Sequence, residues 1–131
     1  MRLSVCASLA LLLLLPASLA QARKSNEEQM LALDPATRLE QRCNARGMGI
    51  VGREHHPMRP DELVAYAFGD PRVQGNMIEA QGAAIRSGGG WYHLSYVCET
   101  TEDRLNIKSF KYTLGNPVPR EQWDQHYLVP R

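Results

Sequence analysis

Residues 77–114 read MIEAQGAAIRSGGGWYHLSYVCETTEDRLNIKSFKYTL, and this stretch decides the fold. It contains three runs of β-compatible residues, separated by the glycine-rich segment SGGG at 87–90 and the polar segment TTED at 100–103. Runs of this kind, joined by short polar or glycine-rich breaks, are typical of neighbouring antiparallel strands. The stretch therefore predicts a three-stranded antiparallel meander.

The middle run shows the two-residue alternation of a half-buried strand, because side chains alternate between the two faces along a strand. One face carries Tyr92, Leu94, Tyr96 and Cys98, and the other carries Trp91, His93, Ser95 and Glu99. In the third run, the apolar residues fall at odd-numbered positions up to Ile107 and at even-numbered positions from Phe110 onward. One inserted residue would restore a single apolar face, so we predict a β-bulge near Lys108–Ser109.

A helix is predicted over residues 35–46. Asp34 is a preferred N-cap residue, and Pro35 suits the first helical position because its missing N–H needs no partner there. Gly47 is a typical residue after a helix end. The apolar stripe of the helix consists of Ala36, Leu39 and Cys43. We expect it to pack on the first strand of the meander, whose small residues are Ala80, Gly82, Ala83 and Ala84.

Residues 47–52 read GMGIVG and match the pattern G-x-G-x-x-G. A dinucleotide site needs a strand before this pattern and a helix after it, whereas here the predicted helix precedes it. We therefore expect a helix stop and a turn, and no cofactor. His55 and His56 are adjacent and point in opposite directions in an extended segment, and His93 and His126 lack ligands at metal-binding spacing. No metal site is expected.

Residues 1–22 resemble a cleaved signal peptide. Arg2 supplies the charged start, residues 9–15 form the apolar run, and small residues allow cleavage after Ala20 or Ala22. The apolar run is short for a membrane span, so we prefer export and cleavage to an uncleaved anchor. The mature chain would begin with a polar spacer, up to residue 30, followed by a single domain at 31–131. Intact-mass measurement of the exported protein checks the cleavage site.

Removal of this segment changes the cysteine and charge balance. Cys43 and Cys98 remain as an even pair, both on apolar faces, and we predict a disulfide between the helix and the central strand. Two buried free thiols are the alternative. Loss of Arg2 leaves basic side chains equal in number to the 14 acidic ones. A net charge near zero argues against a nucleic-acid or anionic-membrane binder.

The predicted helix carries a basic row formed by Arg38, Arg42 and Arg46, which recur at four-residue spacing. Such a row is either an anion or acidic-partner site or a solvated surface. We favour the solvated surface, because rows of surface charge are common and each charge contributes little to stability.

Two further elements complete the predicted fold. Residues 63–68 read LVAYAF and are expected to form a fourth strand, with a helical turn at the start of the segment as the alternative. Residues 120–128 are expected to form one or two helical turns, with Trp123 and Tyr127 at the sheet edge. The fold class is therefore α+β: an N-terminal helix packed on a four-stranded antiparallel meander, one helix-to-strand disulfide and a short C-terminal helical turn.

Short blocks along the whole mature chain resemble those of the domain-of-unknown-function family 930, a family of exported Gram-negative proteins. The matching blocks are Leu33–Pro35, Thr37–Cys43, Arg59–Asp61, Val64–Ala67, Gly82–Ala84, Trp91–Tyr92, Leu94, Cys98, Ser109–Phe110 and Tyr112. The resemblance covers residues 31–128 and implies an envelope location. It implies no activity and no catalytic residue.

We expect a periplasmic, non-enzymatic binding or structural module, with a cell-envelope protein or a cell-wall component as its partner. Its candidate surface is the second face of the central strand, with Trp91, His93 and Arg86. The alternative is a small periplasmic hydrolase or metal-binding enzyme that uses His93 with Glu99 or His55.

Overall fold

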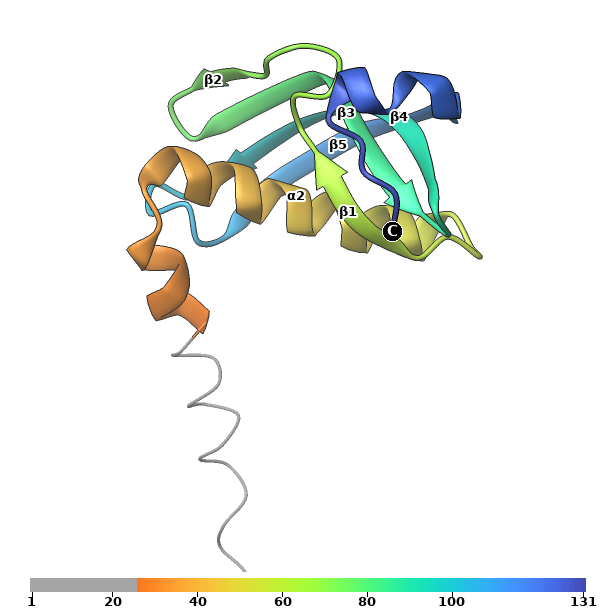
Figure 1. Ribbon diagram of the computed structural model, residues 1–131. Helices are drawn as coiled ribbons and strands as arrows, with labels where there is room; N and C mark the ends of the chain where they lie inside the picture. The colour runs from red at the N-terminus through yellow and green to blue at the C-terminus, as the bar shows by residue number, and fades with distance from the viewer. Residues whose placement is uncertain (1–25) are drawn as a thin grey trace, which may run out of the picture.

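The structure is a computed structural model that describes residues 26–131 (Figure 1). The predicted signal peptide at 1–22 lies outside the described residues. A short helix at residues 26–32 precedes the main elements, where the sequence indicates a polar spacer up to residue 30. The main elements are α2 (Pro35–Glu54), β1 (Pro60–Val64), β2 (Arg72–Gln74), β3 (Met77–Ser87), β4 (Gly90–Thr100), β5 (Ile107–Pro117), and the 3₁₀ turns η1 (Arg120–Gln122) and η2 (Asp124–His126).

The fold is α+β, as predicted, with α2 across one face of an antiparallel sheet and η1 and η2 on the other (Figure 1). The sheet has five strands. The order is β1-β3-β4-β5, and β2 also pairs with β3. The meander of β3, β4 and β5 confirms the prediction for residues 77–114. None of the helices in residues 26–131 is long and apolar enough to cross a membrane.

The fourth strand is shorter than predicted, and a fifth comes from a segment that we expected to be a connector. Residues 60–64 form β1, whereas residues 65–68 form a turn, and residues 72–74 form β2. The turn lies on β3 at Gly82, whose carbonyl accepts the Phe68 N–H at 2.8 Å. A Cβ atom on Gly82 would lie 2.8 Å from the Phe68 carbonyl carbon. A close approach to the small residues of β3 was predicted, and one occurs at Gly82. The segment that approaches Gly82 is the turn at residues 65–68.

The predicted bulge in β5 is confirmed. Thr100 pairs with Ile107 and Glu99 pairs with Ser109, so Lys108 is the extra residue. The bulge places the apolar side chains of β5 on the face that α2 covers. Those packed against the core are Ile107, Phe110, Tyr112 and Leu114.

Helix α2 begins as predicted but ends later. The Asp34 carboxylate accepts the N–H groups of Ala36 and Thr37, each at 3.1 Å. The helix then continues to Glu54, so the predicted stop at Gly47 is wrong. Gly47 is buried inside the helix, and a Cβ there would lie 2.9 Å from Leu63 Cδ1 and 3.0 Å from Phe110 Cζ. The residue permits close packing of the helix on the sheet, which a sequence pattern for helix ends does not reveal.

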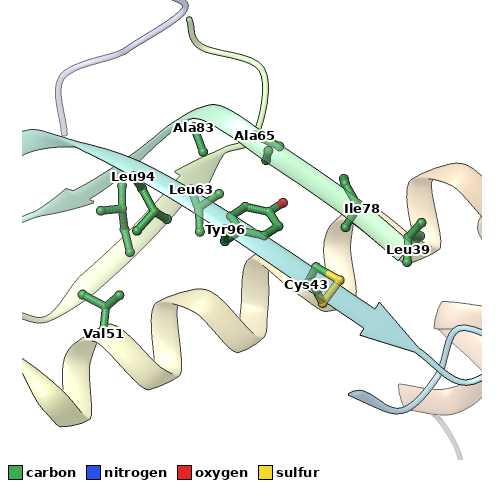
Figure 2. Packing of buried hydrophobic residues seen from close by; sticks show 12 residues of the cluster. Leu39, Cys43, Val51, Leu63, Ala65, Ile78, Ala83, Leu94 and Tyr96 are labelled. Carbon is green, nitrogen blue, oxygen red and sulfur yellow. A yellow bond between two sulfur atoms is a disulfide. The ribbon is translucent and has the colours of Figure 1, made fainter. Parts of the chain in front are cut away.

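The main core lies between α2 and the sheet (Figure 2). Cys43 of α2 and Cys98 of β4 form the predicted disulfide, with Cα atoms 6.0 Å apart. Ala36 is exposed, so the buried stripe starts one turn later than predicted, at Leu39. Other members of this core are Leu39, Val51, Leu63, Ala65, Ile78, Ala83, Leu94 and Tyr96.

A second core lies on the opposite face of the sheet, under the C-terminal segment. Its buried members are Val64, Ala67, Ala84, Trp91, Val118, Trp123 and Leu128. The two 3₁₀ turns confirm the predicted short C-terminal helical turn, and Trp123 is buried while Tyr127 is exposed. This segment closes part of the face opposite α2.

Two glycines of α2 provide a matched test of the close helix packing. Gly49→Ala should stabilise the protein by about 0.5–1 kcal/mol, because glycine is a poor helix residue and the new methyl group meets only the flexible end of Arg53, 3.3 Å away. Gly47→Ala should instead destabilise it by about 1–3 kcal/mol, because the methyl group overlaps Leu63 and Phe110. Urea unfolding of both variants measures the difference. Equal stabilisation by the two substitutions would contradict the close contact.

Candidate functional site

Two of the three residues expected on an exposed binding face are buried. Trp91 is 1% exposed, and its Nε1 donates to the carbonyl of Val129 at 2.9 Å. The Arg86 guanidinium pairs with Asp61 at 2.8 Å and with Glu62 at 2.9 Å. The expectation of a solvent-facing surface is therefore wrong here. The alternation of β4 separates the two faces but cannot show that a distant segment covers the second one.

His93, the third of these residues, contacts the same covering layer. Its ring centroid lies 4.4 Å from that of Phe68, and the His126 ring lies 4.1 Å from Phe68. His126 Nδ1 is also 2.9 Å from the carbonyl oxygen of Ala67. These rings join the turn after β1 to the C-terminal segment, and we infer that they stabilise the covering layer.

The residues of the enzyme alternative are not brought together. His93 and Glu99 are six positions apart on β4, which corresponds to about 20 Å along a strand. His55 follows α2 on the other side of the sheet, where its Nε2 is 3.0 Å from the Tyr112 hydroxyl oxygen. Within residues 26–131, no group of three or more His, Cys, Asp or Glu side chains could hold a metal ion.

The basic row of α2 divides into two parts. Arg38 donates to four main-chain carbonyls at 2.8–2.9 Å, and so ties the chain before α2 to the β4–β5 loop. The four acceptors are Met30, Leu31, Leu33 and Asp103. Arg38 is therefore a structural residue. Arg42 and Arg46, one and two turns further along, line a cleft instead.

This arginine cleft consists of two adjoining hollows that share Arg42 and Asn106. The first has a volume of about 290 Å³ and lies between α2 and the start of β5. The second has a volume of about 390 Å³ and extends to the short helix at residues 26–32. The first is lined by Arg42, Ala45, Arg46, Asn106 and Ile107, and the second by Asn26, Glu27, Met30, Arg42, Leu105 and Asn106.

Arg42 is half-buried and Arg46 is exposed, and Arg42 has one unsatisfied hydrogen-bond donor inside the protein. Its Nε atom is buried and has no hydrogen-bond partner within the described part of the chain. A buried donor without an acceptor costs about 1–3 kcal/mol. The ion pairs between described residues involve neither Arg42 nor Arg46, although Glu27 lines the second hollow. The cleft therefore presents two guanidinium groups whose charge no carboxylate of residues 26–131 pairs.

The wall of the cleft opposite α2 is held in place by Arg104. This residue has a left-handed backbone conformation, with φ of 60°, in the loop that leads to Leu105 and Asn106. Its guanidinium donates to the carbonyl of Gly75 at 2.9 Å and to the carbonyl of Pro35 at the start of α2. These bonds fix the loop to α2 and to the β2–β3 turn. The cleft is therefore preorganised.

The outer edge of β5 starts at the cleft. In the part of the chain that the structure describes, β5 pairs only with β4, so no strand lies along its other edge. The strand is 11 residues long. It carries Lys108, which pairs with Glu99 at 3.0 Å, and the exposed Lys111. Ile107, its first residue, lines the first hollow.

Tyr112 joins β5 to the end of α2. Its hydroxyl group donates to the Glu54 carboxylate and also lies 3.0 Å from His55 Nε2. Burial, followed by the hydrogen bond and the negative charge of Glu54, raises the pKa of Tyr112 to about 12. The phenol therefore remains protonated at physiological pH and fixes the far end of the helix to β5.

The fold defines a small α+β domain in which a disulfide ties one helix to an antiparallel sheet. The chain belongs to the family described as Domain of Unknown Function (DUF930), whose model matches residues 30–128. This confirms the resemblance to family 930. Neither the curated proteins nor the solved structures include a match to this chain.

Sequence reasoning identified Arg42 and Arg46 but missed the rest of the cleft. Leu105, Asn106 and Ile107 meet the two arginines only through tertiary contact, and no spacing in the sequence connects the two groups. The row Arg38, Arg42, Arg46 was the available signal. The four-residue spacing could not show that Arg38 donates hydrogen bonds to main-chain carbonyls, whereas the Nε of Arg42 has no acceptor among the described residues.

The raised pKa of Tyr112 predicts a loss of stability at alkaline pH. In the unfolded chain tyrosine ionises near its ordinary value of 10.0, whereas in the native protein Tyr112 keeps its proton to about pH 12. The native state thus binds more protons between these values, so this contribution to stability falls as pH rises. Glu54→Gln should lower the pKa of Tyr112, since it removes the negative charge. Tyrosinate absorbance, compared with that of Tyr112→Phe, measures the shift, and an unchanged titration would contradict the contact.

Proposed function

We propose that this protein is an exported binding module that recognises an anionic group of a cell-envelope partner in the arginine cleft. The proposal rests on Arg42, which lines both hollows and has no ion pair among the described residues, in a cleft whose opposite wall is fixed by Arg104. Arg46 adds a second guanidinium to the first hollow. Guanidinium groups bind carboxylates and phosphates through paired, charge-assisted hydrogen bonds, so both arginines suit an anionic ligand.

Export is supported by two independent features of the chain. The first 22 residues have the charged start, apolar run and small-residue frame of a signal peptide. The Cys43–Cys98 disulfide supports the same location, because disulfides persist in oxidising compartments such as the periplasm and are rare in the cytosol. Both features support a periplasmic location, where envelope proteins and cell-wall components are available as partners.

Binding is favoured over catalysis by the chemistry of the cleft. Arginine keeps its proton in proteins and cannot serve as a general base at physiological pH. The cleft also contains Asn106, an amide that recognises polar groups but does not transfer protons. Glu27 lines the second hollow, where the described residues of the lining include no His, Cys, Lys or second carboxylate to complete an acid–base pair. The histidines of the enzyme alternative lie elsewhere, since His93 packs against Phe68 and His55 contacts Tyr112.

Neutralisation of the cleft should abolish partner binding without unfolding the protein. Mature protein with Arg42→Gln and Arg46→Gln should retain about a tenth or less of the partner that the wild type captures from envelope extract, since each lost charge-assisted bond contributes about 1.5–3 kcal/mol. The matched control is Arg53→Gln with Arg59→Gln, which removes the same charge from exposed positions outside the cleft. It should capture the partner at wild-type level. Quantitative mass spectrometry of the captured material provides the measurement.

Equal loss in both double variants would show that general charge attraction, rather than the cleft, is responsible. Full retention by the cleft variant would contradict the proposal directly. Circular dichroism should show the same fold for all three proteins, because neither arginine of the cleft has an ion pair among the described residues.

A further inference from the structure

We infer that the anionic group belongs to an extended acidic segment of a protein, and that this segment pairs as an additional strand with the outer edge of β5. This inference rests on the proposed function, because it takes the arginine cleft as the place where an acidic side chain binds. Beyond that function, it specifies that the partner is a protein segment and that strand pairing holds the main chain of this segment.

The unpaired edge of β5 favours a polypeptide as the partner. An edge strand presents a row of main-chain N–H and C=O groups at regular spacing, and another extended chain can pair with them. Eleven residues give β5 an edge much longer than the short edge strands that proteins use to avoid such pairing. A free phosphate or a lipid headgroup could bind the arginines, but neither would satisfy this row of alternating donors and acceptors.

The charges near this edge favour an acidic segment. Arg42 and Arg46 line the cleft at the start of β5, and Lys108 and Lys111 lie on the strand itself. Of these four basic residues, only Lys108 has an ion pair among the described residues, with Glu99.

Two further carboxylates lie in this region, Glu27 in the second hollow and Glu54 at the Tyr112 hydroxyl, so basic residues still exceed acidic ones. Two copies of this chain paired through β5 would bring like charges together, which is unfavourable. The charge distribution therefore disfavours a second copy and attracts a chain rich in Asp and Glu.

The cleft and the edge are continuous, because Ile107 is both the first residue of β5 and a wall of the first hollow. A segment that pairs with the start of β5 thus delivers a carboxylate to the arginines. Further along, Phe110, Tyr112 and Leu114 lie on the helix side of β5 and are only partly buried. The added strand should therefore have apolar residues at alternate positions on that side and acidic residues facing the lysines.

The probe is the acetylated and amidated nonapeptide Glu-Glu-Val-Glu-Val-Glu-Val-Glu-Glu. In an extended peptide the odd positions lie on one face, which here carries three valines between two terminal glutamates. A glutamate on this face can therefore reach the arginine cleft whether the peptide pairs parallel or antiparallel to β5. Binding to the mature protein is followed by amide chemical shifts. We expect saturable shifts along β5 and at Arg42 and Arg46. The peptide with lysine in place of glutamate should not bind, and the Arg42→Gln/Arg46→Gln variant should bind about tenfold or more weakly.

Two methylated peptides test strand pairing itself. In a strand, main-chain N–H groups alternate between the two edges, so only one set can face β5. Of two analogues, N-methylated at the odd or at the even internal positions, one should lose binding by about tenfold or more while the other binds like the parent. Equal binding of both analogues and the parent would overturn strand addition. The same conclusion would follow if the shifts mapped to residues 118–131.

Anionic probes without a peptide backbone separate an error in the strand-pairing inference from an error in the proposed function. Inorganic phosphate and vesicles of phosphatidylglycerol with phosphatidylcholine serve as anionic probes without a peptide backbone. If they bind at Arg42 and Arg46 and the nonapeptide does not shift β5, strand addition is wrong although the cleft still binds anions. If the cleft variant retains the envelope partner, the proposed function is wrong as well.

Discussion

The position of α2 depends on the covalent bond between Cys43 and Cys98. This bond joins the middle of α2 to the central strand β4, and it closes a loop between residues 55 positions apart. In the chain-entropy model such a loop corresponds to about 4 kcal/mol of stability, a large share for a domain of this size. Because Arg42 immediately precedes Cys43, the same bond fixes where the guanidinium groups emerge beside β5. The anchor of the fold thereby also positions the candidate site.

The two faces of the sheet have different roles. On one face the C-terminal segment buries Trp91, whose Nε1 donates to the carbonyl of Val129, so internal packing covers the part of that face around Trp91. On the other face α2 packs closely at Gly47 and leaves the outer edge of β5 open within the described chain. The proposed recognition site lies on the side formed by α2 and β5, where Arg42 and Arg46 line the cleft. The preorganised loop held by Arg104 lowers the entropic cost of binding there.

Local patterns predicted the features that depend on neighbouring residues. The Asp34 cap, the alternation of β4 and the bulge at Lys108 all follow from the order of a few side chains. The disulfide was also predictable, since both cysteines lie on apolar faces and are the two that remain if the predicted signal peptide is removed. Gly47 inside the helix, the turn at 65–68 and the burial of Trp91 depend on tertiary packing between distant segments. Asn106 lies beside Arg42 and Arg46 through the same kind of tertiary packing, so no local sequence pattern could reveal its place in the cleft.

The open edge of β5 beside the arginine cleft can be measured by native-state hydrogen exchange of the protein in the absence of a partner. In an edge strand only alternate amides donate to the neighbouring strand. We expect amides of β5 to alternate between slow and fast exchange, while amides throughout β4 exchange slowly because strands flank β4 on both sides. Uniform protection along β5 in the isolated protein would show that its edge is already covered. That result would contradict the account.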